Sequence, residues 1–139
     1  MSTLEKAIEI ACGAHLGQVD KAGELYVLHP LRLMFMFQDD VERIVAVLHD
    51  VVEDSEISLD DLKFYGFSEI IIDAVNCLTK KVNESYDDFI VRISSNSLAK
   101  KIKIEDIKDN LDLTRMASIN EQDLARVKKY HKSLNFLLQ

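Results

Sequence analysis

The chain has 139 residues, of which 47% are hydrophobic, and it carries a formal net charge of −7 at pH 7. This length and composition suffice for one domain with a buried core, and they exclude an intrinsically disordered chain. The acidic balance argues against non-specific binding to nucleic acid or to an anionic membrane surface. No apolar run approaches the roughly 20 residues that a membrane helix needs.

The start of the chain and its two cysteines bear on the compartment. The segment MSTLEKAIEIACG has no basic region ahead of an apolar stretch, so we do not expect a signal peptide. Cys12 and Cys77 lie far apart and form no CxxC pair, which is typical of buried, reduced thiols, with a disulfide between the two as the alternative. We therefore expect a cytoplasmic protein.

All of the expected elements are helices. Only one proline and four glycines interrupt the chain. In chain order, we predict helices over about residues 3–16, 30–38, 39–54, 58–65, 67–80, 85–95, 97–115 and 119–138. Ser2 and Glu5 have the spacing of a capping box for the first helix. Pro30 suits the first turn of the second, and Asp39 can cap the third. The predicted fold is a compact all-α array of about seven or eight helices, with boundaries good to roughly two to four residues.

The stretch VLHDVVED, residues 47–54, places four polar side chains in an otherwise apolar helix. Valine and leucine at helical spacing indicate that this helix faces the core, where unpaired charge is costly. On a continuous helix His49, Asp50, Glu53 and Asp54 can line one edge. A metal ion would be a partner for all four. The alternative is a helix end at which Glu53 and Asp54 face water.

Two further patterns add candidate ligands. Lys103, Asp106 and Asn110 follow one another at spacings of three and four, which predicts a polar stripe on one face of a helix. A solvated surface gives the same pattern. His29 stands directly before Pro30 at a predicted helix start, where it could be a ligand, a helix cap or a packed imidazole.

Together these motifs resemble a known family. The segments GAHLGQVDKAGELYVLHP, VLHDVVED and KIEDIKDN occur in that order, and they combine YxxHP, HDxxED and KxxDxxxN. This combination is similar to the HD-domain hydrolases, most closely the hydrolase domains of RelA/SpoT-type alarmone enzymes and the small alarmone hydrolases. The resemblance runs from about Ala14 to Arg115. It implies a single all-α HD-type phosphohydrolase domain over residues 1–139 that binds one divalent metal, usually manganese.

The resemblance also implies roles for individual residues. The metal ligands would be His29, His49, Asp50 and Asp106. The catalytic residues would be Glu53 and Asp54, and the residues near the substrate would be Lys21, Lys103 and Asn110. Two imidazoles and two carboxylates suit manganese, iron, cobalt or zinc better than calcium. Because only His15 and His131 remain as further histidines, a one-metal site is favoured.

Other substrate contacts are suggested by ESYDDFIVRISSN, which offers Tyr86 and Arg92. Packing of the tyrosine and surface pairing of the arginine are the alternatives. Asp20 stands beside Lys21 where alarmone hydrolases often have two basic residues. This departure predicts weaker recognition of guanine.

The expected function is metal-dependent hydrolysis of a nucleotide, with guanosine 3′,5′-bis(diphosphate), which would lose its 3′-pyrophosphate, as the leading substrate. A metal-activated water would attack phosphorus. Two alternatives stay open. One is an HD-type phosphatase that acts on another nucleotide, and the other is a nucleotide-sensing module with little turnover. The sequence does not indicate an oligomeric state.

Overall fold

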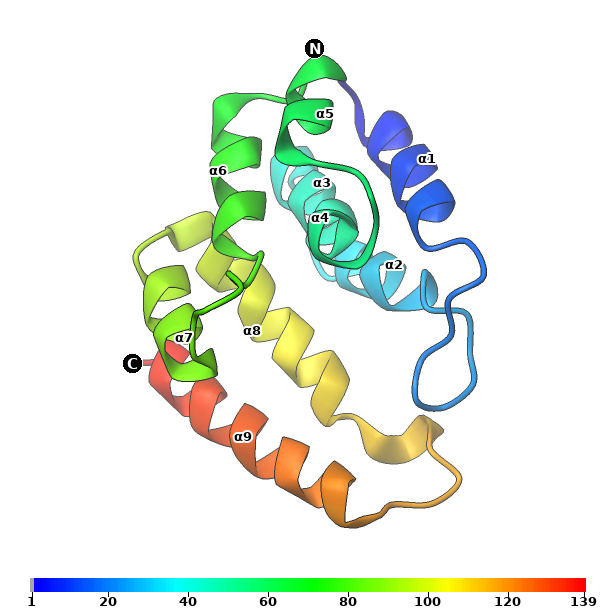
Figure 1. The fold of residues 1–139 in the computed structure, drawn as a ribbon, viewed down its shortest axis with the longest axis vertical. Coiled ribbons are helices and arrows are strands. Elements are labelled where there is room, and N and C mark those ends of the chain that lie inside the picture. Colours follow the sequence, from blue (N-terminus) through cyan, green and yellow to red (C-terminus); the bar gives the residue numbers. More distant parts are fainter. Residues whose placement is uncertain (1) are drawn as a thin grey trace.

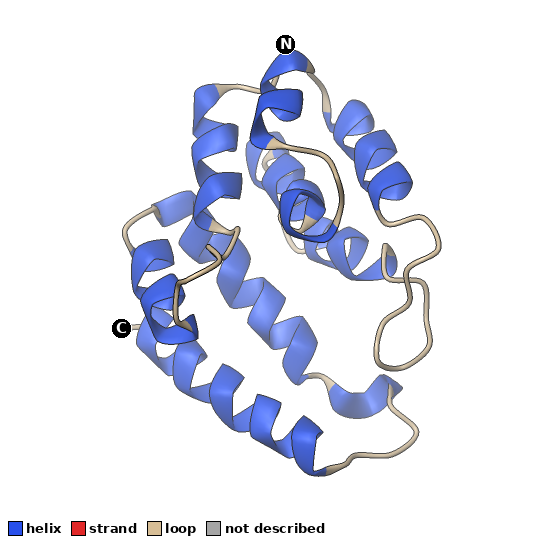
Figure 2. Cartoon of the chain, viewed as in Figure 1, coloured by secondary structure: helices blue, strands red, loops and turns tan. Residues whose placement is uncertain are grey.

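The computed structural model describes residues 2–139, and in this part of the chain the regular elements are nine α-helices and one short 3₁₀ helix (Figures 1 and 2). The helices are α1 (Leu4–Ala14), α2 (Leu28–Phe35), α3 (Asp40–Leu48), α4 (Val51–Asp54), α5 (Leu59–Phe64), α6 (Glu69–Cys77), α7 (Tyr86–Ser94), α8 (Ser97–Leu111) and α9 (Glu121–Leu137), and the 3₁₀ helix η1 spans Leu113–Arg115. This confirms the predicted all-α class. None of the described helices has the length and apolar character needed to cross a membrane. Both cysteine thiols are free, but Cys12 is exposed and Cys77 only partly buried.

The core is built around α3. All residues from Ile44 to Leu48 are buried, and four of the five have no exposed surface. Helices α1 and α2 pack on one side of α3, and α6 and α8 also contact it (Figure 1). Helix α8 runs through the middle of the molecule and contacts α2, α3, α6, α7 and α9. A polar residue on the inner face of α8 is therefore held against several other helices.

Helix starts lie close to the predicted positions, and the starts of α1 and α2 are shifted by one and two residues. Asp39 caps α3, since its carboxylate accepts a hydrogen bond from the backbone N–H of Glu42. The predicted cap at Ser2 is wrong by one residue, because the Thr3 hydroxyl accepts from the backbone N–H of Lys6 instead. Helix α2 begins at Leu28, two residues before the predicted start, so its first turn includes His29.

The third predicted helix is not continuous. Helix α3 ends at Leu48 and α4 begins at Val51, because the backbone of Asp50 (φ −105°, ψ 0°) leaves the helical path. The ring Nδ1 of His49 lies 2.6 Å from the carbonyl oxygen of Ala46, which the N–H of Asp50 would otherwise use in a continuous helix. The interruption raises the number of helices from the predicted seven or eight to nine.

Arg92 fastens the connection between α6 and α7. Its guanidinium binds both carboxylate oxygens of Glu84, at 2.7 and 2.9 Å, and donates to the backbone carbonyls of Asn76 and Thr79. With these partners its donors are committed to the fold. Arg92 does not line the cavity described below, so the structure gives no support to its predicted role as a substrate contact.

The Glu84–Arg92 pair predicts a pH dependence of stability. Hydrogen bonds from Arg92 lower the pKa of Glu84 to about 2, from an ordinary value of 4.5. Because the pKa is depressed in the folded state, the stabilisation is present above about pH 4.5 and is lost as the pH falls toward 2. We expect Glu84→Gln to lower the melting temperature at pH 7 more than at pH 3. Glu56→Gln, at an exposed glutamate, is the control. An equal loss at both pH values for Glu84→Gln would contradict this account.

Candidate metal centre and active-site cavity

A cavity of about 480 Å³ opens between α2, α4, α8, α9 and the loop that follows α1. Its lining is strongly charged and of both signs. The acidic residues are Asp20, Asp50, Glu53, Asp54, Asp106, Asp109, Asp112 and Asp123, and the basic ones are Lys21, Arg32, Lys103, Arg115 and Arg126. Such a wall can hold a cation at one point and phosphate oxygens at another.

The four predicted ligands lie close together although they come from three segments. His29, His49 and Asp50 each offer one ligand atom within 4.8 Å of the others. Asp106 reaches both imidazoles, since its Oδ1 lies 2.8 Å from Nε2 of His29 and 3.6 Å from Nε2 of His49. Both histidines and Asp106 are buried. The break between α3 and α4 allows His49 and Asp50, which are adjacent in sequence, to face the same point.

The chemistry of His49 indicates what this cluster can bind. Its Nδ1 donates to the carbonyl oxygen of Ala46, because a carbonyl can only accept. In the neutral ring Nε2 is therefore a lone pair. Among the described residues it has no hydrogen-bond partner, and it lies 3.0 Å from Oδ2 of Asp50. A lone pair facing a carboxylate is repulsive unless a proton or a metal cation lies between them. The donor set of the cluster fits a divalent cation.

Charge balance points in the same direction. Burial disfavours the charged form of His49, but Asp50 and Asp106 outweigh it and raise the pKa of His49 well above its ordinary value. For Asp106, burial is likewise outweighed by Lys103 and the two histidines, which hold its pKa well below the ordinary range. The cluster therefore favours positive charge between ionised carboxylates.

Neighbouring side chains fix the two carboxylates. The hydroxyl of Tyr26 donates to Oδ2 of Asp50. Nζ of Lys103 lies 2.9 Å from Oδ2 of Asp106, and the amide of Asn110 donates to its Oδ1 at 3.2 Å. Lys103 and Asn110, predicted to lie near the substrate, do line the cavity, but both also bind Asp106.

Glu53 and Asp54 lie on α4 at the cavity wall. The backbone N–H of Lys80 donates to Oε1 of Glu53 at 2.8 Å, which restrains that carboxylate. For Asp54, loss of solvent contact and the negative charges of Asp50 and Glu53 raise the pKa to about 6. One wall of the cavity thus carries an oriented carboxylate beside another that gains a proton near neutral pH.

The other predicted contacts are divided. Lys21 lines the cavity, from the loop after α1. Tyr86 does not; its ring packs against Phe89 and Tyr130, and its hydroxyl is buried. The packing alternative therefore describes Tyr86 better than a substrate contact.

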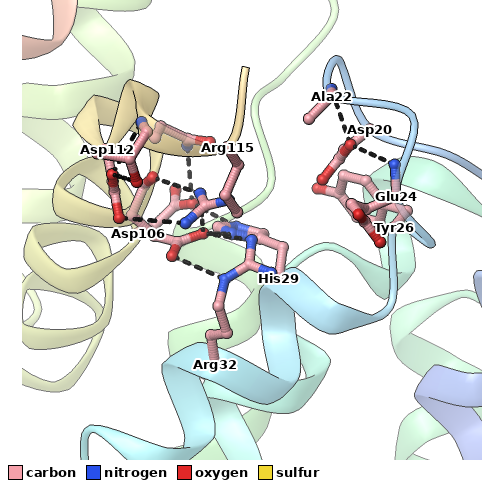
Figure 3. Close-up of polar contacts among 12 residues, drawn as sticks. Asp20, Ala22, Glu24, Tyr26, His29, Arg32, Asp106, Asp112 and Arg115 are labelled. Atoms are coloured by element: carbon pink, nitrogen blue, oxygen red, sulfur yellow. Dashed lines mark hydrogen bonds and ion pairs between the residues drawn. The ribbon is translucent and has the colours of Figure 1, made fainter. Parts of the chain in front are cut away.

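Asp20 has a different role from the expected one. Its Oδ1 accepts hydrogen bonds from the backbone N–H groups of Ala22 and Glu24, both at 2.9 Å (Figure 3). Gly23, between them, has a φ of +84°, a conformation that favours glycine. The Asp20 carboxylate thus stabilises the loop through these hydrogen bonds, so its effect is more than the loss of a basic residue at this position.

Sequence reasoning assigned no site role to several residues that line the cavity, among them Tyr26, Arg32, Asp109, Arg115 and Arg126. Figure 3 shows Arg32 and Arg115 reaching toward His29 from different segments. A spacing of three residues could have indicated two of the five. Arg32 follows His29 by three, and Asp109 follows Asp106 by three, so each pair shares one helix face.

Known proteins with similar sequences agree with the family that the motifs resemble. No protein-family model matches the chain. The chain is 30% identical over 132 residues to a GTP pyrophosphokinase of Streptomyces coelicolor, a match that covers 86% of this chain and 16% of that protein. It is 37% identical over 79 residues to a guanosine-3′,5′-bis(diphosphate) 3′-pyrophosphohydrolase of Borreliella burgdorferi, which covers 54% of this chain and 12% of that protein. The chain thus spans less than a fifth of the length of these curated relatives.

A solved structure agrees in fold. It belongs to a metazoan ortholog of SpoT that hydrolyses ppGpp, and it superposes with a TM-score of 0.82 at 22% identity. The match covers 100% of this chain and 86% of that one. The order of the motifs, the buried His/His/Asp cluster and these matches show that the chain belongs to the HD-type domains of the RelA/SpoT alarmone enzyme family.

Proposed function

We propose that the chain is a metal-dependent phosphohydrolase that removes the 3′-pyrophosphate from guanosine 3′,5′-bis(diphosphate), here called guanosine tetraphosphate. The observation that carries this proposal is the buried cluster of His29, His49, Asp50 and Asp106 beside a cavity lined by charges of both signs. In this cluster Nε2 of His49 lies 3.0 Å from Oδ2 of Asp50 and has no hydrogen-bond partner among the described residues. The names of the relatives from Borreliella burgdorferi and Vibrio cholerae support the choice of substrate.

The proposed metal ligands are His29, His49, Asp50 and Asp106. Nitrogen and oxygen donors in these numbers suit a transition-metal dication, and manganese is our choice. When bound, such an ion lowers the pKa of a coordinated water and polarises a phosphoryl oxygen.

The remaining chemistry belongs to the side chains of the cavity wall. Glu53, oriented by the N–H of Lys80, takes the proton from the attacking water. Asp54, with a pKa of about 6, is suited to give a proton to the ribose 3′-oxygen, which departs with the nucleotide when the water attacks phosphorus. Lys21, Arg115 and Arg126 face the same cavity and hold phosphate oxygens.

Metal addition tests the centre directly. A dication at about 100 times its dissociation constant stabilises the fold by about 2.7 kcal/mol, which raises the melting temperature by roughly 5–10 °C in a chain of this size. We expect this rise with Mn²⁺, its reversal by a chelator, and its loss in Asp106→Asn. Asp112→Asn removes a more exposed cavity carboxylate and should keep the rise. Equal shifts in both variants would place the metal elsewhere.

Glu53→Gln separates chemistry from metal binding. The amide keeps an oxygen that can accept from the N–H of Lys80, but it cannot take a proton. We expect turnover of guanosine tetraphosphate to fall by about 100-fold or more, while the Mn²⁺-dependent rise in melting temperature remains. Pyrophosphate release measures the rate. A variant that turns over at the wild-type rate would transfer the role of base to Asp54.

The loop after α1 gives a further prediction. Asp20→Asn keeps the acceptor for Ala22 and Glu24 and removes one negative charge from the cavity. We expect the Michaelis constant for guanosine tetraphosphate to fall by roughly two- to five-fold, an effect of about 0.5–1 kcal/mol that weakens at high salt. Asp20→Arg adds a cation but loses both loop hydrogen bonds, so it should gain less. A larger gain for the arginine would mean that the hydrogen bonds are unimportant for binding.

A screen of nucleotides with Mn²⁺ distinguishes the proposed substrate from the alternatives. The proposal is supported if guanosine tetraphosphate is the one nucleotide of the screen from which pyrophosphate is released. Release of phosphate from another nucleotide would assign the same machinery to that substrate, and binding without turnover would indicate a sensor.

A further inference from the structure

Asp109 lies on the inner face of α8, three residues after Asp106, and it contacts the ring of His29. Its Oδ2 lies 2.6 Å from Nδ1 of His29. Arg32 binds the same carboxylate with two donors, Nε to Oδ1 and a terminal nitrogen to Oδ2, both at 2.9 Å. The Asp109 side chain is only 14% exposed. Both of its oxygens are engaged, so the carboxylate cannot rotate without breaking a contact.

The contact determines which nitrogen of His29 faces the metal-ligand cluster. A carboxylate only accepts, so the 2.6 Å contact places a hydrogen on Nδ1. By the same argument, the contact of Nε2 with Asp106 requires a proton or a cation between the two atoms, and in the neutral ring Nε2 offers its lone pair to a cation. Nε2 lies 2.8 Å from Asp106 and 4.0 Å from Asp50, toward the cluster described above. The arrangement parallels that of His49, for which the Ala46 carbonyl holds Nδ1 in the same way.

Arg32 and Arg115 hold Asp109 from the side away from the cluster. Arg115 donates to the Asp109 backbone carbonyl at 3.0 Å and lies 3.5 Å from Oδ2. The side chains of Arg32 and Arg115 are about one-third exposed, whereas that of His29 is 6% exposed. From solvent to interior, the order is therefore the two arginines, the Asp109 carboxylate, the His29 imidazole and the point at which the proposed ion would bind.

We propose that Asp109 is a positioning residue that fixes the tautomer and ring orientation of His29 toward a divalent cation, and that Arg32 holds Asp109 in place. The inference rests on the proposed metal centre and adds a residue outside its four ligands. Carboxylates that orient metal-binding histidines in this manner typically contribute about 10- to 100-fold to metal affinity.

The test compares Asp109→Asn with Asp112→Asn by calorimetric titration of metal-free protein with Mn²⁺. Both changes remove one carboxylate charge at the same end of α8, and both residues contact Arg115, but only Asp109 contacts His29. We expect the dissociation constant of Asp109→Asn to rise by about 10- to 100-fold and that of Asp112→Asn to change by less than about two- or three-fold. Equal changes in the two variants would overturn the inference, because they would reflect charge alone.

A second variant guards against a folding defect. Arg32→Gln leaves Asp109 and His29 intact and removes the two donors that fix the carboxylate. We expect a several-fold rise in the Mn²⁺ dissociation constant, with circular dichroism unchanged. Wild-type affinity in this variant would exclude the role of Arg32.

These measurements contain no nucleotide, so a wrong substrate would leave them unaffected. If the wild-type protein binds Mn²⁺ and the Asp109 variant does so equally well, the inference fails while the proposed function stands. If the wild-type protein does not bind the ion, both fail.

Discussion

The site depends on the way His29 is held between two aspartates across the interface of α2 and α8. One nitrogen of its ring lies 2.6 Å from Asp109 and the other 2.8 Å from Asp106. The two aspartates are one helical turn apart, so a single ring spans the rise of that turn. Because the His29 ring is buried, it has little access to water, so each ring nitrogen needs a partner within the protein. The contacts that hold the His29 ring are therefore also contacts that pack α2 on α8.

A second constraint is local. The break after Leu48 directly follows the buried residues 44–48 of α3 and falls at His49 and Asp50. A helix interior is normally kept regular by its backbone hydrogen bonds. Here the His49 ring takes up the carbonyl of Ala46. The helix is interrupted at His49 and Asp50, and the side chains of these adjacent residues can therefore face the same point.

Much of this could be predicted from the sequence, for identifiable reasons. Helices with strong apolar periodicity and capping residues, such as α3 after Asp39, depend on local information. The motifs indicated the four candidate ligands, because histidine and aspartate are unusual among apolar neighbours. Roles set by tertiary contacts could not be predicted in this way. Arg92 was predicted to contact substrate, but in the structure its guanidinium binds Glu84 at the α6–α7 connection. The role of Asp109 depends on its contact with His29, which the sequence does not show.

The loop between α1 and α2 is fastened at both ends to the segment that carries the catalytic candidates. The amide of Gln18 donates to the backbone carbonyl of Asp54 at 2.9 Å, and the hydroxyl of Tyr26 donates to Asp50. Between these ends the backbone is bridged at Val19 and Leu25. A loop closed in this manner has already lost most of its conformational freedom, so binding of the proposed nucleotide to it would cost little further loop entropy. Because Tyr26 donates to Asp50, a proposed metal ligand, a nucleotide that displaced the loop would also displace that carboxylate. If the proposed ion and nucleotide are coupled in this way, each must alter the affinity of the other by the same factor.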